Sequence, residues 1–152
     1  MFRGIQNINM DTKGRMAMPT KYRDALNSTD AGQLIATIDV QSRCLLIYPL
    51  SAWENVEQSL QKLPSLNPAT RRLKRLMLGH ACELELDGNG RVLLPAVLRD
   101  YAGLEKKLVL AGQGEKFELW SEDNWAAETE QAIMDANSGE LDIPEDLQDL
   151  VF

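Results

Sequence analysis

The sequence predicts an α+β fold, mainly β, made of two tandem copies of one unit that pack against each other as a pseudo-dimer within the chain. The first observation is a repeat: the segment from Asp11 to Asp24 recurs from Asp87 to Asp100, 76 residues later, with the same residue at six positions. The second is that each copy alternates short apolar runs with turn-forming residues, which is typical of hairpins. The third is size, since a unit with so few strands is not stable alone.

The first copy begins with an alternating strand over 5–10, which the polar stretch 11–14 turns back into a short strand over 15–18. Pro19 is expected at the first position of a short helix, where its missing N–H costs nothing. A second strand pair follows at 34–40 and 44–48. Ser51 and Glu54 have the spacing of a capping box, which predicts a helix from Ser51 towards residue 63.

The second copy repeats this order. We expect a strand that ends at Leu86, a turn at 87–90, a helix from Pro95, strands near 108–111 and 116–120, and a helix from about residue 123. Beyond the first helix the best spacing between the copies falls from 76 to 72, which pairs Ile38 with Leu110. We interpret the change as a four-residue deletion in the middle loop of the second copy.

A connecting helix is expected between the copies. Asn67 and Pro68 have the types preferred at its N-cap and first helical position, and Gly79 follows its end. The expected organisation is therefore a first repeat at 5–63, a connecting helix at 64–79, a second repeat at 80–134 and an acidic tail at 135–152. Ser138 and Gly139 should break the last helix before the tail.

Charge is distributed unevenly along the chain. The formal net charge is −7, but residues 121–152 contain ten acids and no Lys or Arg, so residues 1–120 hold sixteen bases against thirteen acids, a net charge of +3. Two basic islands stand out, at 3–23 and at 62–75. The low isoelectric point therefore does not exclude nucleic acid as a partner.

Several classes of protein are not favoured. No apolar run approaches the roughly 20 residues that span a bilayer, and the first residues lack a signal-peptide pattern, so we expect a cytoplasmic protein without a membrane partner. Cys44 and Cys82 are expected to be reduced thiols. His80, the single histidine, gives no material for a metal site or a catalytic triad. We expect no enzyme activity, no cofactor, no metal and no small-molecule substrate.

The repeated pattern Asp-x-x-Gly-Arg-x-x-x-Pro-x-x-x-Arg, at 11–23 and 87–99, resembles the AbrB-like swapped-hairpin family of bacterial DNA-binding proteins. Two such copies in a chain that opens with Met-Phe-Arg-Gly are similar to the MraZ family in particular. The resemblance implies interlocked repeats of the SpoVT-AbrB type, a ring-shaped homo-oligomer, and sequence-specific binding to repeated double-stranded DNA sites. It further implies a nucleoid-associated regulator of the division and cell-wall gene cluster, acting upstream of its own gene.

The residues suggest how DNA would be bound. The first turn presents Lys13 and Arg15 on a hairpin of a shape that a major groove admits, with Arg15 suited to guanine and Lys13 to phosphate. Arg3 and Arg91 are further candidate contacts. The second turn has Asn89 in place of Lys13, so we expect the first repeat to face the DNA.

Other motif residues are expected to maintain the fold, because carboxylates repel phosphate and Gly and Pro set backbone angles. They are Asp11, Gly14, Pro19, Asp87, Gly90 and Pro95. A purely structural role for Arg15 stays open, as an ion pair with Asp11 inside the hairpin. For Arg23 and Arg99, DNA contact and an internal salt bridge are equally open. The tryptophans are expected in the core, with base stacking by Phe117 and Trp120 as a minor alternative.

A second class of function competes with DNA binding. In that alternative the chain is a non-enzymatic oligomeric assembly module, and its acidic tail contacts a protein partner. The basic run 71–75 fits either a solvated helix face or salt bridges to a neighbouring subunit. Salt-dependent binding to promoter DNA separates the two classes.

Overall fold

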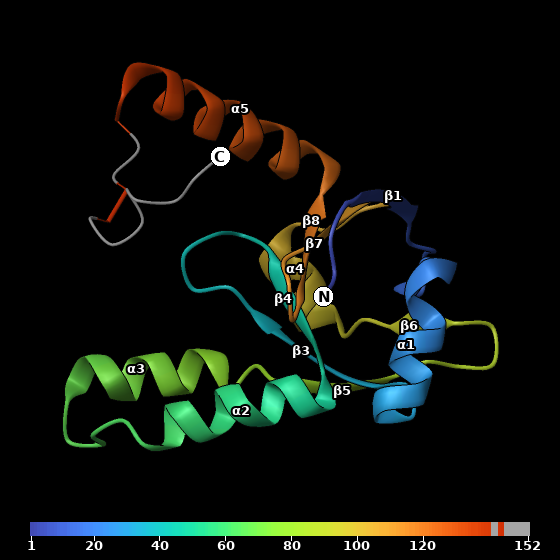
Figure 1. Cartoon of the computed structure of the whole chain (residues 1–152), viewed down its shortest axis with the longest axis horizontal. Helices are drawn as coiled ribbons and strands as arrows, with labels where there is room; N and C mark the ends of the chain where they lie inside the picture. The colour runs from blue at the N-terminus through green and yellow to red at the C-terminus, as the bar shows by residue number, and fades with distance from the viewer. Residues whose placement is uncertain (141–142, 145–152) are drawn as a thin grey trace. The chain divides into compact units, whose positions relative to one another are not determined.

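The computed structural model describes residues 1–140 and 143–144. The chain divides into two compact units, 1–122 and 123–152, which are described separately. The first unit contains β1 (Ile5–Asn9), β2 (Arg15–Ala17), α1 (Thr20–Asp30), β3 (Gln33–Ile38), β4 (Leu45–Pro49), α2 (Leu50–Gln61), α3 (Pro68–Met77), β5 (Cys82–Glu85), β6 (Arg91–Leu93), α4 (Ala96–Ala102), β7 (Lys107–Gly112) and β8 (Phe117–Ser121) (Figure 1). The α+β class with antiparallel strands is therefore confirmed.

The strand order shows how the two copies combine. The larger sheet has the order β1-β7-β8-β4-β3-β5, and β2 pairs with β6 in a separate two-stranded ribbon. The counterparts in the two copies are β1 and β5, β3 and β7, and β4 and β8. When each strand is replaced by its counterpart, the same strand order results, read from the opposite edge of the sheet. This symmetry indicates a pseudo-two-fold axis. Because β1 pairs with β7 and β5 pairs with β3, each copy completes the other's part of the sheet.

The residue pairs at the centre of this arrangement fit the repeat spacing. In the ribbon Met16 lies opposite Val92, which is 76 residues later. In the larger sheet Leu46 lies opposite Glu118, which is 72 residues later. At these two positions a residue thus pairs with its own counterpart, so the pseudo-two-fold axis passes through the β2–β6 pair and through the β4–β8 pair.

The shorter spacing in the second half of each copy arises in a helix. Helix α1 has 11 residues and α4 has 7, whereas the loop from β7 to β8 is only two residues shorter than that from β3 to β4 and the turn before β7 is two residues longer than that before β3. The net difference of four residues therefore equals the shortening of the helix, and the expected four-residue deletion in the middle loop is wrong. Four residues are close to one helical turn, and their removal keeps the same face of the helix towards the core. The buried residues of α1 are Tyr22 and Leu26, and those of α4 are Leu98 and Ala102.

One pairing between the copies also needs correction. Gln6 pairs with Leu110 across β1 and β7, and its counterpart Cys82 pairs with Ala36 across β5 and β3. Leu110 therefore corresponds to Ala36 and not to Ile38. The turns on either side of these strands differ in length, which shifts the register by two residues and preserves the face that each side chain occupies.

Helix starts differ from the sequence prediction in two ways. Pro19 and Pro95 are N-cap residues with extended ψ values of 138° and 147°, one position earlier than expected. The capping box at Ser51 is wrong, because α2 begins at Leu50 without a side-chain cap of its own. Asp30, at the end of α1, instead accepts hydrogen bonds from the backbone N–H of Ser51 (2.9 Å) and from its hydroxyl (3.0 Å).

The connecting helix begins as expected. The Asn67 side chain accepts a hydrogen bond from the Ala69 N–H at 2.8 Å, and Pro68 occupies the first turn of α3. Figure 1 shows α2 and α3 joined by a short loop. The buried Thr37 hydroxyl donates to the Met77 carbonyl at 2.7 Å, which ties the end of α3 to the sheet.

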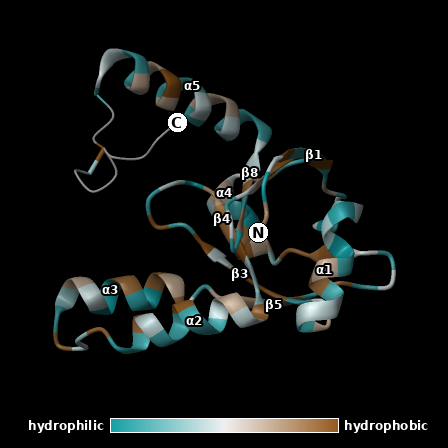
Figure 2. Cartoon of the chain, in the orientation of Figure 1, coloured by the Kyte–Doolittle hydropathy of each residue, from teal (hydrophilic) through white to brown (hydrophobic). Residues whose placement is uncertain are grey.

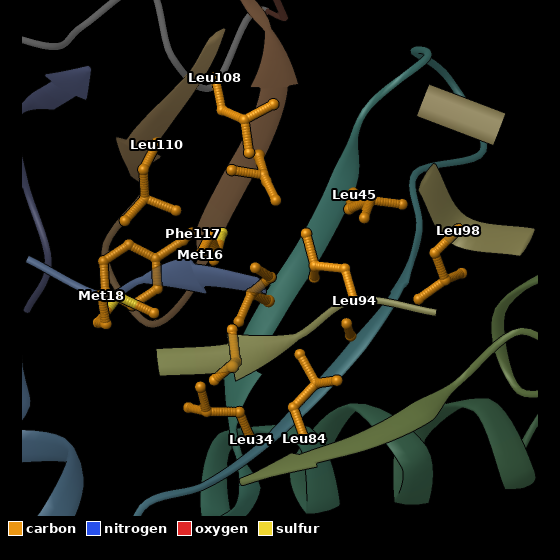
Figure 3. Close-up of a cluster of buried hydrophobic side chains, with 14 of the residues drawn as sticks. Met16, Met18, Leu34, Leu45, Leu84, Leu94, Leu98, Leu108, Leu110 and Phe117 are labelled. Carbon is orange, nitrogen blue, oxygen red and sulfur yellow. The ribbon is translucent and has the colours of Figure 1, made fainter. Parts of the chain in front are cut away.

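Both copies contribute to one hydrophobic core. Figure 3 shows buried side chains of the first copy, such as Met16 and Leu45, with those of the second, such as Leu94 and Phe117. Figure 2 shows the hydrophobic residues concentrated on the central strands. Trp53 and Trp120 are buried as expected, whereas Trp125 is half-buried. Since Phe117 and Trp120 are buried, base stacking by these residues is excluded.

The second unit contains most of α5 (Glu122–Ser138). The helix ends at Ser138, and Gly139 follows with a φ of 77°, so the predicted break is confirmed. Most of the expected amphipathic segment at 143–150 lies outside the described residues. Among the helices that the structure describes, none has the length and apolar character needed to cross a bilayer.

Candidate nucleic-acid interface

The ribbon of β2 and β6 brings the two motif arginines onto one surface. Arg15 pairs with Leu93, and Ala17 pairs with Arg91. Because side chains alternate along a strand and partners share a face, these four residues lie on the same face of the ribbon. Met16 and Val92 point to the opposite face and are buried in the core. The outer face of the ribbon is here defined by Arg15, Ala17, Arg91 and Leu93.

The first turn holds Arg15 through Asp11. One carboxylate oxygen of Asp11 accepts the backbone N–H groups of Lys13 (3.0 Å) and Arg15 (2.9 Å), and the other accepts the Arg15 Nε–H (3.0 Å). Gly14 has a φ of 93°, a backbone conformation that suits glycine. The expected cap and ion pair are therefore present. They orient Arg15 and leave its four Nη hydrogens to a ligand.

The second turn repeats the backbone pattern with a weaker ion pair. Asp87 accepts the N–H groups of Asn89 (2.8 Å) and Arg91 (2.9 Å). Its other oxygen lies 3.5 Å from the Arg91 Nε, and this buried Nε has no hydrogen-bond partner among the described residues. Arg91 is thus held less firmly than Arg15, although both side chains are 38% exposed.

The turns also set the charge of their carboxylates. The hydrogen bond from the Arg15 backbone N–H, together with that from its side chain, lowers the pKa of Asp11 below its ordinary value of 3.8. The Arg91 backbone N–H has the same effect on the pKa of Asp87. Both carboxylates are therefore ionised at neutral pH, and each faces a permanently charged guanidinium.

Arg3 does not lie beside the ribbon. Its carbonyl accepts a hydrogen bond from the Tyr22 hydroxyl at 2.6 Å, and the Lys21 ammonium lies 4.8 Å from the centroid of the Tyr22 ring. The whole of β1 separates Arg3 from the first turn. The basic island at 3–23 is thus divided, with Lys13 and Arg15 at the turn and Arg3 and Lys21 at the other end of β1.

Arg23 and Arg99 are not salt-bridge partners within the described part of the chain. The Arg23 Nε donates to the Met18 carbonyl at 2.7 Å, and the Arg99 Nε donates to the Leu94 carbonyl at 3.0 Å. A backbone carbonyl is therefore the partner of each Nε, where an acid was one of the open alternatives. Leu93, which the sequence did not single out, is 57% exposed on the outer face of the ribbon. Its position two residues after Arg91 was the signal that could have found it.

Three residues that could bind a metal already take part in hydrogen bonds. Asp39, Cys44 and Glu118 have ligand atoms within 4.8 Å of one another. However, the Cys44 thiol donates to Asp39 at 3.5 Å, and Glu118 accepts from the Trp120 indole at 3.0 Å. We assign no metal to this group, and the absence of a metal stays a prediction. The Nδ1 of His80 lies 2.7 Å from the Leu76 carbonyl oxygen at the end of α3.

These features define a class of protein: a duplicated α+β chain whose two copies share one antiparallel ribbon and each present on it an arginine beside an aspartate. Comparison with models of protein families agrees with the duplication, since residues 1–76 and 77–142 each match the family described as "MraZ protein, putative antitoxin-like". The chain belongs to the MraZ family.

Relatives of known name cover nearly the whole chain. A protein of Halorhodospira halophila named "Transcriptional regulator MraZ" is 50% identical over 152 residues, which is 100% of both chains. Proteins with the same name from Thioalkalivibrio sulfidiphilus and Legionella pneumophila are 59% and 51% identical. The former match covers 82% of this chain and 83% of the relative, and the latter 97% of each.

Proposed function

We propose that the chain is a sequence-specific DNA-binding transcriptional regulator that reads double-stranded DNA with the outer face of the ribbon. The names of the relatives support regulation of transcription. The observation that carries the proposal is Arg15, which Asp11 orients through its Nε while the Nη groups are left to a ligand. A two-stranded ribbon is one of the elements that the major groove of B-DNA admits.

The chemistry of the contact follows from the donors. The Nη groups of Arg15 donate two hydrogen bonds to O6 and N7 of a guanine, a contact worth on the order of 1–3 kcal/mol of discrimination. Orientation by Asp11 before binding lowers the entropy lost when the contact forms. Lys13, exposed at the turn, pairs with a phosphate, and Arg91 and Arg3 add secondary contacts.

We further propose that several copies form a ring-shaped homo-oligomer with AbrB-like swapped hairpins. One ribbon contacts few base pairs, so a single copy binds weakly. Several ribbons on one assembly gain affinity through effective concentration when the DNA sites are spaced to match. The proposed targets are repeated sites upstream of its own gene, in the division and cell-wall cluster. The proposed location is the cytoplasm, on the nucleoid, without a cofactor.

Footprinting and fluorescence anisotropy test the proposed function. The protein is titrated into DNA from upstream of its own gene and into a shuffled sequence of the same composition, at several salt concentrations. We expect protection at repeated sites, and log affinity that falls against log salt with a slope near −0.9 per neutralised phosphate. Equal affinity for the shuffled DNA would contradict sequence-specific reading. No binding to either DNA would favour the assembly module.

Light scattering tests the oligomer. We expect a mass of several chains, and an affinity that depends on the number and phasing of the DNA repeats. A monomer that binds a single site as tightly as a repeated one would contradict the ring.

A further inference from the structure

Each hairpin turn rests on a guanidinium group that comes from the other copy. A methyl group added at Gly14 would lie 2.8 Å from the Nε of Arg99, and one added at Gly90 would lie closer still to the Nε of Arg23. Gly14 and Gly90 are counterparts in the repeat, as are Arg23 and Arg99. The contact is therefore reciprocal and crossed: the turn of the first copy is packed against Arg99 of the second, and the converse holds for Arg23.

Hydrogen bonds continue from Arg99 to the first turn. The Arg99 Nε–H donates to the Leu94 carbonyl (3.0 Å), and the Leu94 N–H donates to the Gly14 carbonyl (2.9 Å). The Gly14 N–H donates to the Asp11 carbonyl (3.1 Å), and the Asp11 carboxylate holds Arg15. The hydrogen bonds alternate with covalent bonds within Leu94, Gly14 and Asp11, and together they connect the guanidinium of Arg99 to that of Arg15.

The same sequence of bonds runs in the opposite direction from Arg23. Its Nε–H donates to the Met18 carbonyl (2.7 Å), and the Met18 N–H donates to the Gly90 carbonyl (2.8 Å). The Gly90 N–H donates to the Asp87 carbonyl (2.9 Å). This route ends at Arg91, whose Nε lacks the hydrogen bond that the Arg15 Nε makes.

We propose that Arg99 is the positioning residue for Arg15, and that Arg23, which is closer to Arg15 in sequence, serves the turn of the second copy. The proposal rests on the proposed function for its effect on DNA. Removal of the Arg99 guanidinium opens a space beneath Gly14 and leaves the Leu94 carbonyl without this donor. The first turn then loses its fixed conformation, and Arg15 must be ordered at the moment of binding.

Hydrogen exchange of the full chain without DNA tests the crossed support. Exchange is followed by mass spectrometry in peptides that contain 11–16 or 87–92, for the parent, Arg99→Ala and Arg23→Ala. We expect faster exchange at 11–16 in Arg99→Ala and at 87–92 in Arg23→Ala. Faster exchange in the variant's own copy, or equal changes in both turns, would overturn the proposal.

DNA binding by double variants tests the consequence. Arg99→Ala should lower operator affinity, and adding it to Arg15→Lys, which retains the charge but lacks the Nε–H that Asp11 orients, should cause little further loss, because both changes disable one contact. Arg99→Ala and Arg91→Ala should instead reduce affinity independently. A salt slope that falls by one phosphate in Arg99→Ala would mean that Arg99 itself contacts DNA, which overturns a positioning role.

Two controls keep the outcomes distinct. If Arg99→Ala does not fold, Arg99→Lys retains the charge and removes the Nε–H donor, and the same crossed pattern of exchange is expected. If the parent does not distinguish operator from shuffled DNA, the proposed function fails while the exchange experiment still decides the crossed support. Unchanged exchange at 11–16 in both Arg99 variants would overturn the inference alone.

Discussion

The two hairpins have the same scaffold and offer different groups to a ligand. In both, an aspartate accepts two backbone N–H groups of its turn and faces an arginine. In the first hairpin the arginine Nε lies 3.0 Å from the carboxylate and makes a hydrogen bond, whereas in the second the distance is 3.5 Å and no such bond forms. The first turn also exposes Lys13 where the second exposes Asn89. The shared backbone arrangement therefore does not by itself determine DNA binding, and the side chains favour the first hairpin as the DNA-contacting one.

The largest expected effect is on stability, where counterpart side chains of the two copies should contribute differently. Phe117 is fully buried and stacks on Phe2 with ring centroids 4.2 Å apart, while its counterpart Leu45 is equally buried and lies opposite Ile38 and Leu119 in the sheet. Phe117→Ala should lower the free energy of unfolding by about 3–5 kcal/mol. Leu45→Ala should cost less, because it removes no aromatic contacts. Urea denaturation measures both, and a larger loss for Leu45→Ala would contradict the difference.

The next effect concerns the aspartates. Asp11→Asn keeps an oxygen for the backbone N–H groups but replaces the acceptor of the Arg15 Nε with an amide donor. Operator affinity should fall several-fold, since Arg15 loses its orientation. Asp87→Asn is the matched control and should change affinity little, because the Arg91 Nε makes no hydrogen bond. Anisotropy titrations measure both, and equal losses would break the comparison.

The exposed residues at positions 13 and 89 of the two turns should influence how DNA affinity depends on salt. Lys13→Asn gives the first turn the side chain of the second, and the slope of log affinity against log salt should become shallower by about 0.9 for each ribbon that contacts DNA. Asn89→Lys makes the reverse change. Because both turns flank the same ribbon, that variant should leave the slope unchanged only if the second turn makes no phosphate contact, which is what we expect. A slope that Lys13→Asn does not alter would contradict the phosphate contact.

The effect of pH on the turns should be confined to acid solution. The pKa values of Asp11 and Asp87 are lowered in the folded chain, so their contribution to stability is complete above the unfolded value of 3.8 and is lost as pH falls through the folded values. Carboxyl ¹³C titration, with Asp11→Asn and Asp87→Asn for assignment, measures both groups. Titration of either carboxyl at or above 3.8 would contradict the hydrogen bonding described.

The smallest effect at physiological salt is expected from the acidic end of the chain. Two roles are open for the acids of this segment: they only solubilise the chain, or they also compete with phosphate for the basic islands. If they compete, the following result is expected. Deletion of residues 136–152 should raise affinity for shuffled DNA at low salt. The difference should shrink as the Debye length falls from about 30 Å at 0.01 M to about 8 Å at 0.15 M salt. Unchanged low-salt affinity would leave solubility as its only role.

The local features of this fold were accessible from the sequence. The repeat spacing of 76 placed both turns, and the Asn67 cap was predicted because its partners lie within three residues. The expected pairing of the strands on either side of each turn is wrong, because β1 pairs with β7 and β2 with β6. The cap of α2 was missed because Asp30 lies 21 residues before Ser51, too far for a local motif. The four-residue difference was placed in a loop because spacing alone does not distinguish a shorter loop from a shorter helix.

The candidate site shows the same division between local and long-range information. The turn residues and the Asp11–Arg15 pair follow from positions close together in the sequence. The shared ribbon does not, because it depends on which strands pair between the copies. The contact of Arg99 with the first turn spans 85 residues, and no pattern within either copy indicates it.

The central claim is that Arg15 of the first hairpin reads the DNA and that Arg91 of the second contributes less. The most direct test is the operator affinity of Arg15→Ala and Arg91→Ala, measured side by side with the parent after circular dichroism and light scattering have shown an unchanged fold and oligomer. We predict that Arg15→Ala abolishes specific binding while Arg91→Ala retains most of it. Parental operator affinity in Arg15→Ala, or an equal loss in both variants, would contradict the claim.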